Sequence, residues 1–417
     1  MATVGSVAAT GETARVRTMG LFLNVGHFLD HLFTLIFATV AALVLTREWG
    51  MSYGELLAYA TPGFLAFGLF SLPAGWLADR WSREGMIAVF FVGIGLASMA
   101  TALAATPLQL GFGLFVVGIF AAIYHPVGLA LVARQQAGMG MAIAVNGVWG
   151  NLGVGSAALL TGYMIDTAGW RAAFVWPGIV SVLLGLAYTY VAWPEISGRN
   201  GRAAGSPKPV AAVAAAAATS DRDLRALMIR LSAIIFFTTA VSSIVFQSTT
   251  FALPKVFDER LGGIAGSATA IGWLAFLVFA VASMAQLIVG SLLDRLGPRL
   301  VFMGVAVIQI VFFLAMPGLR DWAALAVALA FMLGAFGQIP INDYMIGRLA
   351  KSEMRAQIYG VRYVVSFVVL AATLPLIGYV HQTWGFDMLF RILAGAAAAI
   401  FLAVALLPNR LPVAEGR

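Results

Sequence analysis

Charged residues are scarce in this chain. Asp, Glu, Lys and Arg make up 10% of its 417 residues, 61% of the residues are hydrophobic, and the mean hydropathy is +0.94. Soluble domains carry about 25% charged residues, so this chain lacks the polar side chains that a fully hydrated surface needs. We therefore expect lipid, rather than water, to cover most of the protein.

Cysteine is absent, which excludes disulfides and thiolate metal ligands. No P-loop, HExxH or GxSxG pattern occurs, so neither an ATP-driven pump nor a hydrolytic enzyme is indicated. The net charge of +7 is spread over short loops rather than gathered on one face, which does not favour nucleic-acid binding. We expect a protein that is not an enzyme and that needs no cofactor.

What the chain has instead is long apolar segments. A bilayer-spanning helix takes about 20 mostly apolar residues, and twelve segments reach that length. Barrel strands would be shorter and would alternate in polarity, so the sequence predicts an all-α membrane protein with twelve transmembrane helices in two six-helix bundles. The predicted spans are 19–45, 52–77, 85–105, 108–133, 140–164, 172–193, 226–253, 266–292, 299–317, 322–347, 356–380 and 388–408.

A short motif occurs in both halves. GWLADR at 75–80 returns as GSLLDR at 290–295, so that Asp79 corresponds to Asp294, 215 positions later. Pro126 and Pro340 are similarly spaced, 214 positions apart. Internal duplication of this kind is typical of secondary transporters. It predicts bundles over 19–193 and 224–408, a linker over 194–223, and tails over 1–18 and 409–417.

The basic residues predict the orientation. With the amino terminus inside, eighteen of the 25 Lys and Arg fall on the cytoplasmic side and six fall outside. Cytoplasmic loops are enriched in Lys and Arg. We therefore expect a multi-pass protein of a bacterial-type inner membrane, monomeric, with both termini in the cytoplasm.

Twelve spans, a long central loop and the duplicated motif together resemble the major facilitator superfamily. The family's loop signature matches nearly in full, although Ser82 replaces its second glycine. The resemblance implies that the motif aspartate contacts a helix of the opposite half and holds the inner gate shut. Solvated loop charges are the other interpretation of the arginines. The residues assigned to gating are Gly75, Asp79, Arg80, Arg83, Gly290, Asp294 and Arg295.

Three further segments resemble the fosmidomycin-resistance branch of drug exporters within that superfamily. They are GHFLDH at 26–31, YHPVG at 124–128 and NGVWGNLGVG at 146–155. The resemblance implies export by proton antiport, although the fifth span lacks the Gly-Pro pair common in such antiporters. Uptake by symport would use the same parts.

Ionisable groups inside a membrane cost about 2.5–3.5 kcal/mol each on insertion scales and are functional candidates. His27, Asp30 and His31 share one face of the first span and are predicted to couple protons to transport. A structural pair between Asp30 and either histidine is one alternative. A transition-metal site is another, with His27, Asp30, His31 and His125 as ligands, which would make the protein a metal exporter.

The second half holds a different set of polar residues. Arg362 can bind a carboxylate or phosphonate through two hydrogen bonds and cannot itself carry the proton. Asp343 is predicted either to bind substrate or to pair with Arg362 or a loop arginine. We therefore predict a small polar, anionic organic substrate; the rival is a membrane protein that does not transport, such as a sensor or a lipid-handling protein. The predicted substrate contacts are Tyr124, His125, Asn146, Trp149, Gln247, Asp343, Arg362 and Tyr363.

Overall fold

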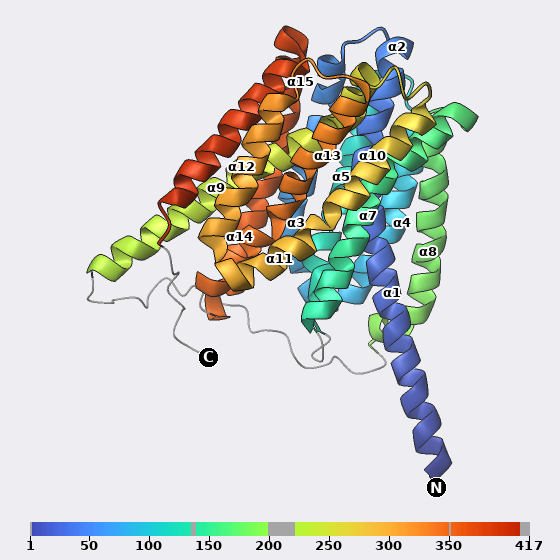
Figure 1. Ribbon diagram of the computed structural model, residues 1–417. Coiled ribbons are helices and arrows are strands. Elements are labelled where there is room, and N and C mark those ends of the chain that lie inside the picture. The colour runs from blue at the N-terminus through green and yellow to red at the C-terminus, as the bar shows by residue number, and fades with distance from the viewer. Residues whose placement is uncertain (1, 135–138, 199–221, 350–351, 409–417) are drawn as a thin grey trace.

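The computed structural model describes residues 2–134, 139–198, 222–349 and 352–408, and every regular element within these ranges is helical (Figure 1). The blue-to-green first half and the yellow-to-red second half lie side by side in Figure 1. The all-helical prediction is confirmed. The alanine run of the predicted linker and the tail over 409–417 lie outside the described residues.

The first half contains six spans, two of which are interrupted by a single π-helical turn. α1 begins at Ala2, so the backbone of the predicted tail over 2–18 continues the first helix. The elements of this half are α1 (Ala2–Val40), η1 (Ala41–Leu45), α2 (Thr46–Glu48), α3 (Tyr53–Arg80), α4 (Arg83–Thr101), α5 (Pro107–Ala121), η2 (Tyr124–Gly128), α6 (Leu129–Val132), α7 (Met139–Ala168) and α8 (Ala172–Ile196).

The second half repeats this arrangement, with breaks between consecutive helices in two spans. Its elements are α9 (Arg222–Arg260), α10 (Ala268–Ser283), α11 (Ala285–Leu296), α12 (Pro298–Ala315), α13 (Asp321–Gly337), α14 (Ile339–Leu349) and α15 (Ser352–Ala405).

Eleven helices within the described residues are long and apolar enough to span a membrane. The last of them, Val368–Ala405, would be about 57 Å long if straight, nearly twice the hydrocarbon thickness of a bilayer. It is interrupted at Gly385, whose φ of 73° and ψ of −179° are not helical. Gly385 therefore separates two spans, which agrees with the predicted total of twelve.

The sequence explains several helix boundaries locally. Ser52 and Glu55 form a capping box at the start of α3, and Ser82 caps α4. In the fourth span, Pro126 lies inside the π-helical turn η2. Proline has no N–H and its ring clashes with the preceding turn, so the regular helix is widened at this residue. The predicted distortion at Pro126 is therefore present.

The two halves meet closely at the end of the bundle where α3 and α10 begin, which we call the closed end. There α3 packs on α15, and a Cβ on Gly54 would lie 2.7 Å from the carbonyl oxygen of Gly378. Farther in, the buried ring of Phe251 lies 5.8 Å from the ring of Phe64 and 6.5 Å from that of Phe37. Backbone and aromatic contacts thus seal this end.

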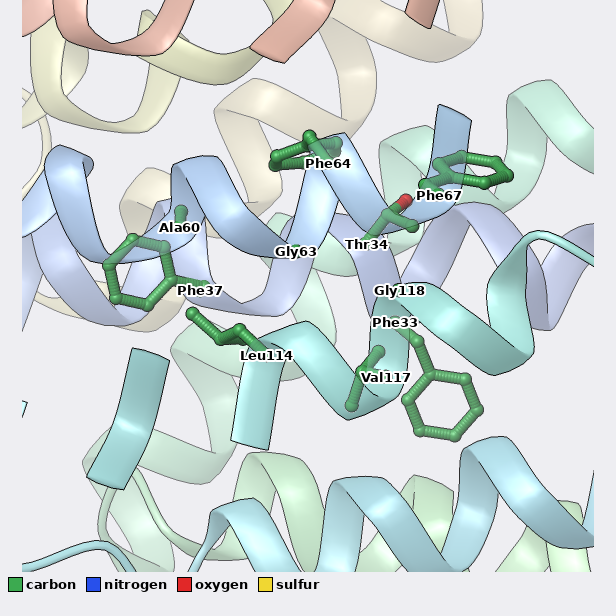
Figure 2. A pocket seen from close by; sticks show the side chains of 10 residues that line it. All are labelled: Phe33, Thr34, Phe37, Ala60, Gly63, Phe64, Phe67, Leu114, Val117 and Gly118. Atoms are coloured by element: carbon green, nitrogen blue, oxygen red, sulfur yellow. The ribbon is translucent and has the colours of Figure 1, made fainter. Parts of the chain in front are cut away.

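The first half also contains an apolar cavity of about 20 Å³ just inside this seal, between α1, α3 and α5 (Figure 2). Phe33, Phe37, Phe64 and Phe67 contribute four aromatic rings to its lining. The cavity is large enough for a single water but offers it few polar partners. Thr34 is the only residue of its lining that carries a polar side chain.

At the opposite end, where α3 ends and α4 begins, the described residues of the two halves are not in close contact. Asp294 is exposed, and a Cβ added to Gly147 of α7 or Gly290 of α11 would meet no described atom within 4 Å. α11, which follows α10 in the same span and lies toward this end, packs on α12, α13 and α14 of its own half. The structure is thus closed at one end and open at the other, one of the two states that alternating access requires.

The close contact between α3 and α5 yields a stability prediction. A Cβ on Gly118 would lie 2.0 Å from the carbonyl oxygen of Gly63, which is backbone and cannot rotate away. Gly118→Ala should destabilise the protein by about 1–3 kcal/mol through overpacking. Gly304→Ala is the control, because nothing lies within 4 Å of its added Cβ. Thermal unfolding in detergent tests this, and equal melting temperatures for the two variants would contradict it.

Candidate functional site

Residues of two elements come together in the interior of the first half. α1 supplies His27, Asp30 and His31, and η2 supplies His125. The three histidines offer ring nitrogens that all lie within 4.8 Å of one another. The predicted cluster on the first span is therefore joined by the histidine of the fourth span, which we had assigned to substrate contact. We call these four residues the His/Asp cluster.

Asp30 is fully buried and pairs across the two spans. Its Oδ2 lies 3.4 Å from His125 Nε2, within ion-pair distance, and neither carboxylate oxygen accepts a hydrogen bond from a described residue. The alternative in which Asp30 bonds to His27 or His31 is not what the structure has. An isolated buried charge costs several kcal/mol, so His125 is the group that stabilises an ionised Asp30.

His27 and His31 form a second pair within the cluster. His27 Nδ1 lies 2.8 Å from the carbonyl oxygen of Asn146, which can only accept, so Nδ1 carries a proton. His27 Nε2 lies 3.2 Å from His31 Nε2. In the neutral pair, His27 Nε2 therefore accepts the hydrogen bond and His31 donates it.

The orientation of His27 depends on Tyr124 and Asn146. The Tyr124 ring stacks on the His27 ring at 5.0 Å, and its hydroxyl donates to the carbonyl oxygen of Leu23. Asn146 Nδ2 donates to Tyr124 Oη at 2.9 Å and to Asn24 Oδ1 at 3.0 Å. Tyr124 and Asn146, predicted as substrate contacts, thus hold the cluster in place within the first half.

A glycine makes room for this arrangement. A Cβ on Gly150 of α7 would lie 2.7 Å from the ring of His27. Only glycine at this position lets α7 approach α1 closely enough for Asn146 to reach His27. The NGVWG segment singled out in the sequence therefore includes a packing residue of the cluster.

The second half contains a buried polar network that sequence reasoning missed. Gln338 Nε2 donates to the carbonyl oxygen of Ser242, and Gln309 Nε2 donates to Gln338 Oε1, both at 3.1 Å. Gln338 stands 214 positions after Tyr124, the same offset that separates Pro126 from Pro340. Tyr124 lies two residues before Pro126, and Gln338 lies two residues before Pro340. In each half, this polar residue donates a hydrogen bond to a backbone carbonyl oxygen of the first span of that half. Applying the 214-residue offset to Tyr124 would have identified Gln338.

The other predicted substrate residues are less closely defined. Trp149, Gln247 and Asp343 are half-buried on α7, α9 and α14. Arg362 and Tyr363 belong to α15, but their side chains lie outside the described residues. Their contacts with substrate stay predictions.

Among the residues that the structure describes, the gating motif makes no hydrogen bond or ion pair across the two halves. Asp79 accepts hydrogen bonds from Arg83 of its own half at 2.7 and 3.0 Å and is 61% exposed. Arg80 lies over the ring of Trp76, and Asp294 and Arg295 are exposed. Asp79 has no partner in the opposite half among the described residues, because the halves are separated at this end.

Gly75, expected to allow close helix approach, is in ordinary contact. A Cβ there would lie 3.5 Å from Pro126 Cβ, which is a normal van der Waals distance. Its counterpart Gly290 faces open space in this state. The tight glycine contacts between the halves are instead at the closed end, at Gly54, Gly162 and Gly272.

A duplicated helical bundle that is closed at one end and encloses titratable groups is typical of membrane transport proteins. The sequence model of the Major Facilitator Superfamily matches residues 23–266 and 235–417. The chain belongs to this superfamily. The finer resemblance to its fosmidomycin-resistance branch stays a prediction.

Solved transporters share the fold. The peptide transporter POT covers 93% of both chains at 14% identity with a TM-score of 0.72, and the nucleoside transporter NupG reaches 0.70 at 16% identity over 93% of this chain and 99% of its own. A bacterial Spinster homologue, solved in an inward-facing and unoccupied conformation, has a TM-score of 0.67 at 14% identity over 94% of both chains. At these identities the likeness concerns the fold alone.

Curated relatives match over part of their length. The niacin transporter NiaP of Acinetobacter baylyi is 28% identical over 40% of this chain and 38% of its own. The 4-hydroxybenzoate transporter PcaK of Pseudomonas putida is 29% identical over 38% of this chain and 36% of its own. The puromycin resistance protein pur8 of Streptomyces alboniger is 34% identical over 30% of this chain and 25% of its own. The chain thus aligns with less than two-fifths of each relative.

Proposed function

We propose that this protein is a proton-coupled secondary transporter of a small organic carboxylate, and that it exports its substrate by antiport. Protons bind at the His/Asp cluster of the first half, and the substrate binds between the halves against Arg362 of the second. Rocking of the two halves exposes the interior to each side in turn.

The observation that carries the proton part is the pairing of Asp30 with His125. A carboxylate with no exposed surface and one ionisable partner can change its protonation state only when a path to water opens. His27 and His31 form a hydrogen-bonded pair beside it. Two adjacent titratable pairs in a membrane interior provide the sites that proton binding and release require.

The substrate class rests on charge and on the relatives. Arginine binds carboxylates through two parallel hydrogen bonds, and Arg362 is the positively charged residue predicted within a span of the second half. Curated relatives include transporters named for niacin, 4-hydroxybenzoate and gallate. Each of these compounds carries one carboxyl group on an aromatic ring, so we propose aromatic monocarboxylates as the first substrates to test.

Transport by the purified full-length chain in liposomes, under an imposed pH gradient, tests the proposal. Antiport should concentrate 4-hydroxybenzoate in the more acidic compartment, whereas symport should concentrate it in the more alkaline one. Protein-free liposomes correct for passive entry of the protonated acid, which also favours the alkaline side. If the amount of accumulated substrate were the same with a pH gradient of either sign and with none, proton coupling would be refuted.

The same preparation separates proton coupling from the metal alternative. A tetrahedral zinc site, with Zn–N distances of about 2.0–2.1 Å, places ligand nitrogens about 3.3 Å apart. The His27–His31 pair meets this at 3.2 Å, but the ligand nitrogens of the three histidines are grouped only within 4.8 Å of one another, and Asp30 does not belong to the group. Thermal stabilisation by Zn²⁺ that is lost in His27→Ala would favour the metal alternative over the one proposed.

A further inference from the structure

The carboxylate of Asp166 bridges the two halves at the closed end. Asp166 lies in the last turn of α7, and its Oδ2 accepts hydrogen bonds from the Thr269 backbone N at 2.7 Å and from Thr269 Oγ1 at 2.6 Å. Thr269 lies in the first turn of α10, where backbone N–H groups have no partner within the helix. The first half thus caps a helix of the second.

The cap lies at the end of a seam that only glycine permits. A Cβ on Gly162 of α7 would lie 2.3 Å from the carbonyl oxygen of Ala268, and one on Gly272 of α10 would lie 2.5 Å from that of Ala158. Backbone therefore meets backbone along this seam. The positions of α7 and α10 are fixed relative to each other, and Asp166 reaches Thr269 only while the seam is closed.

Asp166 is itself exposed, as is Arg47, which forms a second polar contact between the halves at this end. Arg47 lies 3.6 Å from Asp258, but its side chain is 79% exposed. Exposed ion pairs contribute little because water screens them and both side chains lose freedom. A carboxylate on a helix amino terminus instead combines charge-assisted hydrogen bonds with the helix dipole.

We propose that Asp166 is the latch of the closed end and that it opposes the Asp79 motif at the other end. The superfamily resemblance assigns to Asp79 a contact with a helix of the opposite half, and in this state Asp79 is bound to Arg83 instead. Asp166 makes a contact of that kind here. The two carboxylates cap helices of the opposite half in alternate states, and their balance sets the share of each state.

Distances between spin labels in the full-length chain test this without any substrate. The chain has no cysteine, so two introduced cysteines give a clean pair of labels. Leu103→Cys with Trp322→Cys reports the closed end, and Trp81→Cys with Leu296→Cys reports the open end; all four side chains are exposed. Asp166→Ala should shift the ratio of the two states about fivefold toward opening at the closed end, as expected for the loss of one helix cap.

Two further variants make the result specific. Thr269→Val removes the hydroxyl donor but keeps the backbone N–H, so it should give a smaller shift in the same direction. Asp321→Ala removes a carboxylate that accepts from the Gly263 backbone N at 2.9 Å, at the same end but within one half, and should leave the distances unchanged. Unchanged distances in Asp166→Ala, or an equal shift in Asp321→Ala, would overturn the proposal. Neither outcome depends on the proposed substrate or on proton coupling.

Discussion

Asp30→Asn should abolish the accumulation of substrate that an imposed pH gradient drives, while exchange of labelled for unlabelled substrate continues. Asparagine has the shape of aspartate but cannot ionise, and Asp30 is fully buried with His125 as its partner. Net transport requires the protein to bind and release a proton in each cycle. In exchange, the protein returns with substrate bound and needs no change of protonation. Accumulation with and without the gradient, and exchange in the same liposomes, would be measured together.

His381→Gln is the matched control, because His381 is the one histidine outside the His/Asp cluster and bonds to Glu259 at the closed end. Its response to the gradient should persist even if its rate changes. An Asp30→Asn protein that still accumulates substrate against a concentration gradient would show that another group carries the proton.

Arg362→Lys should weaken binding of an aromatic carboxylate by about 10- to 100-fold, the effect of losing a hydrogen bond to a charged group worth about 1.5–3 kcal/mol. Lysine keeps the positive charge but presents a point charge in place of the planar fork that matches a carboxylate. Equilibrium binding and the KM of exchange are the measurements.

The control for this variant is Arg320→Lys, a conservative change at an exposed arginine of the closed end. It should leave both constants unchanged. If Arg362→Lys bound substrate as tightly as the unchanged chain, Arg362 would have to be removed from the proposed binding site.

The spans could be predicted because hydropathy is a local and additive property. Each segment of about 20 apolar residues enters the membrane largely on its own account. The last two spans were also predicted, from the apolar runs on either side of Gly385, although the structure joins them into one helix that is interrupted only by the backbone conformation of Gly385. The π-helical turn at Tyr124–Gly128 was anticipated only as a distortion by Pro126.

The sequence placed His27, Asp30 and His31 on one helix face but did not predict how the side chains of the His/Asp cluster pair; their role stays a prediction. Offsets of three and four residues place His27, Asp30 and His31 on one face of α1, yet they do not say which neighbour each side chain will meet. Asp30 turns to His125 of the fourth span, and His27 turns to Asn146 of the fifth. The buried Gln338 network was missed because glutamine in an apolar segment carries no charge to draw attention.

The sequence by itself determined the class of protein: a low charge content, twelve apolar segments and a duplicated motif leave few alternatives to a two-bundle membrane transporter. Only the tertiary structure decided which end is closed. Both states use the same spans and differ in contacts between residues far apart, such as Asp166 and Thr269, which are 103 positions apart. Such contacts depend on how whole bundles pack, and that information is spread over many residues rather than held in any local pattern.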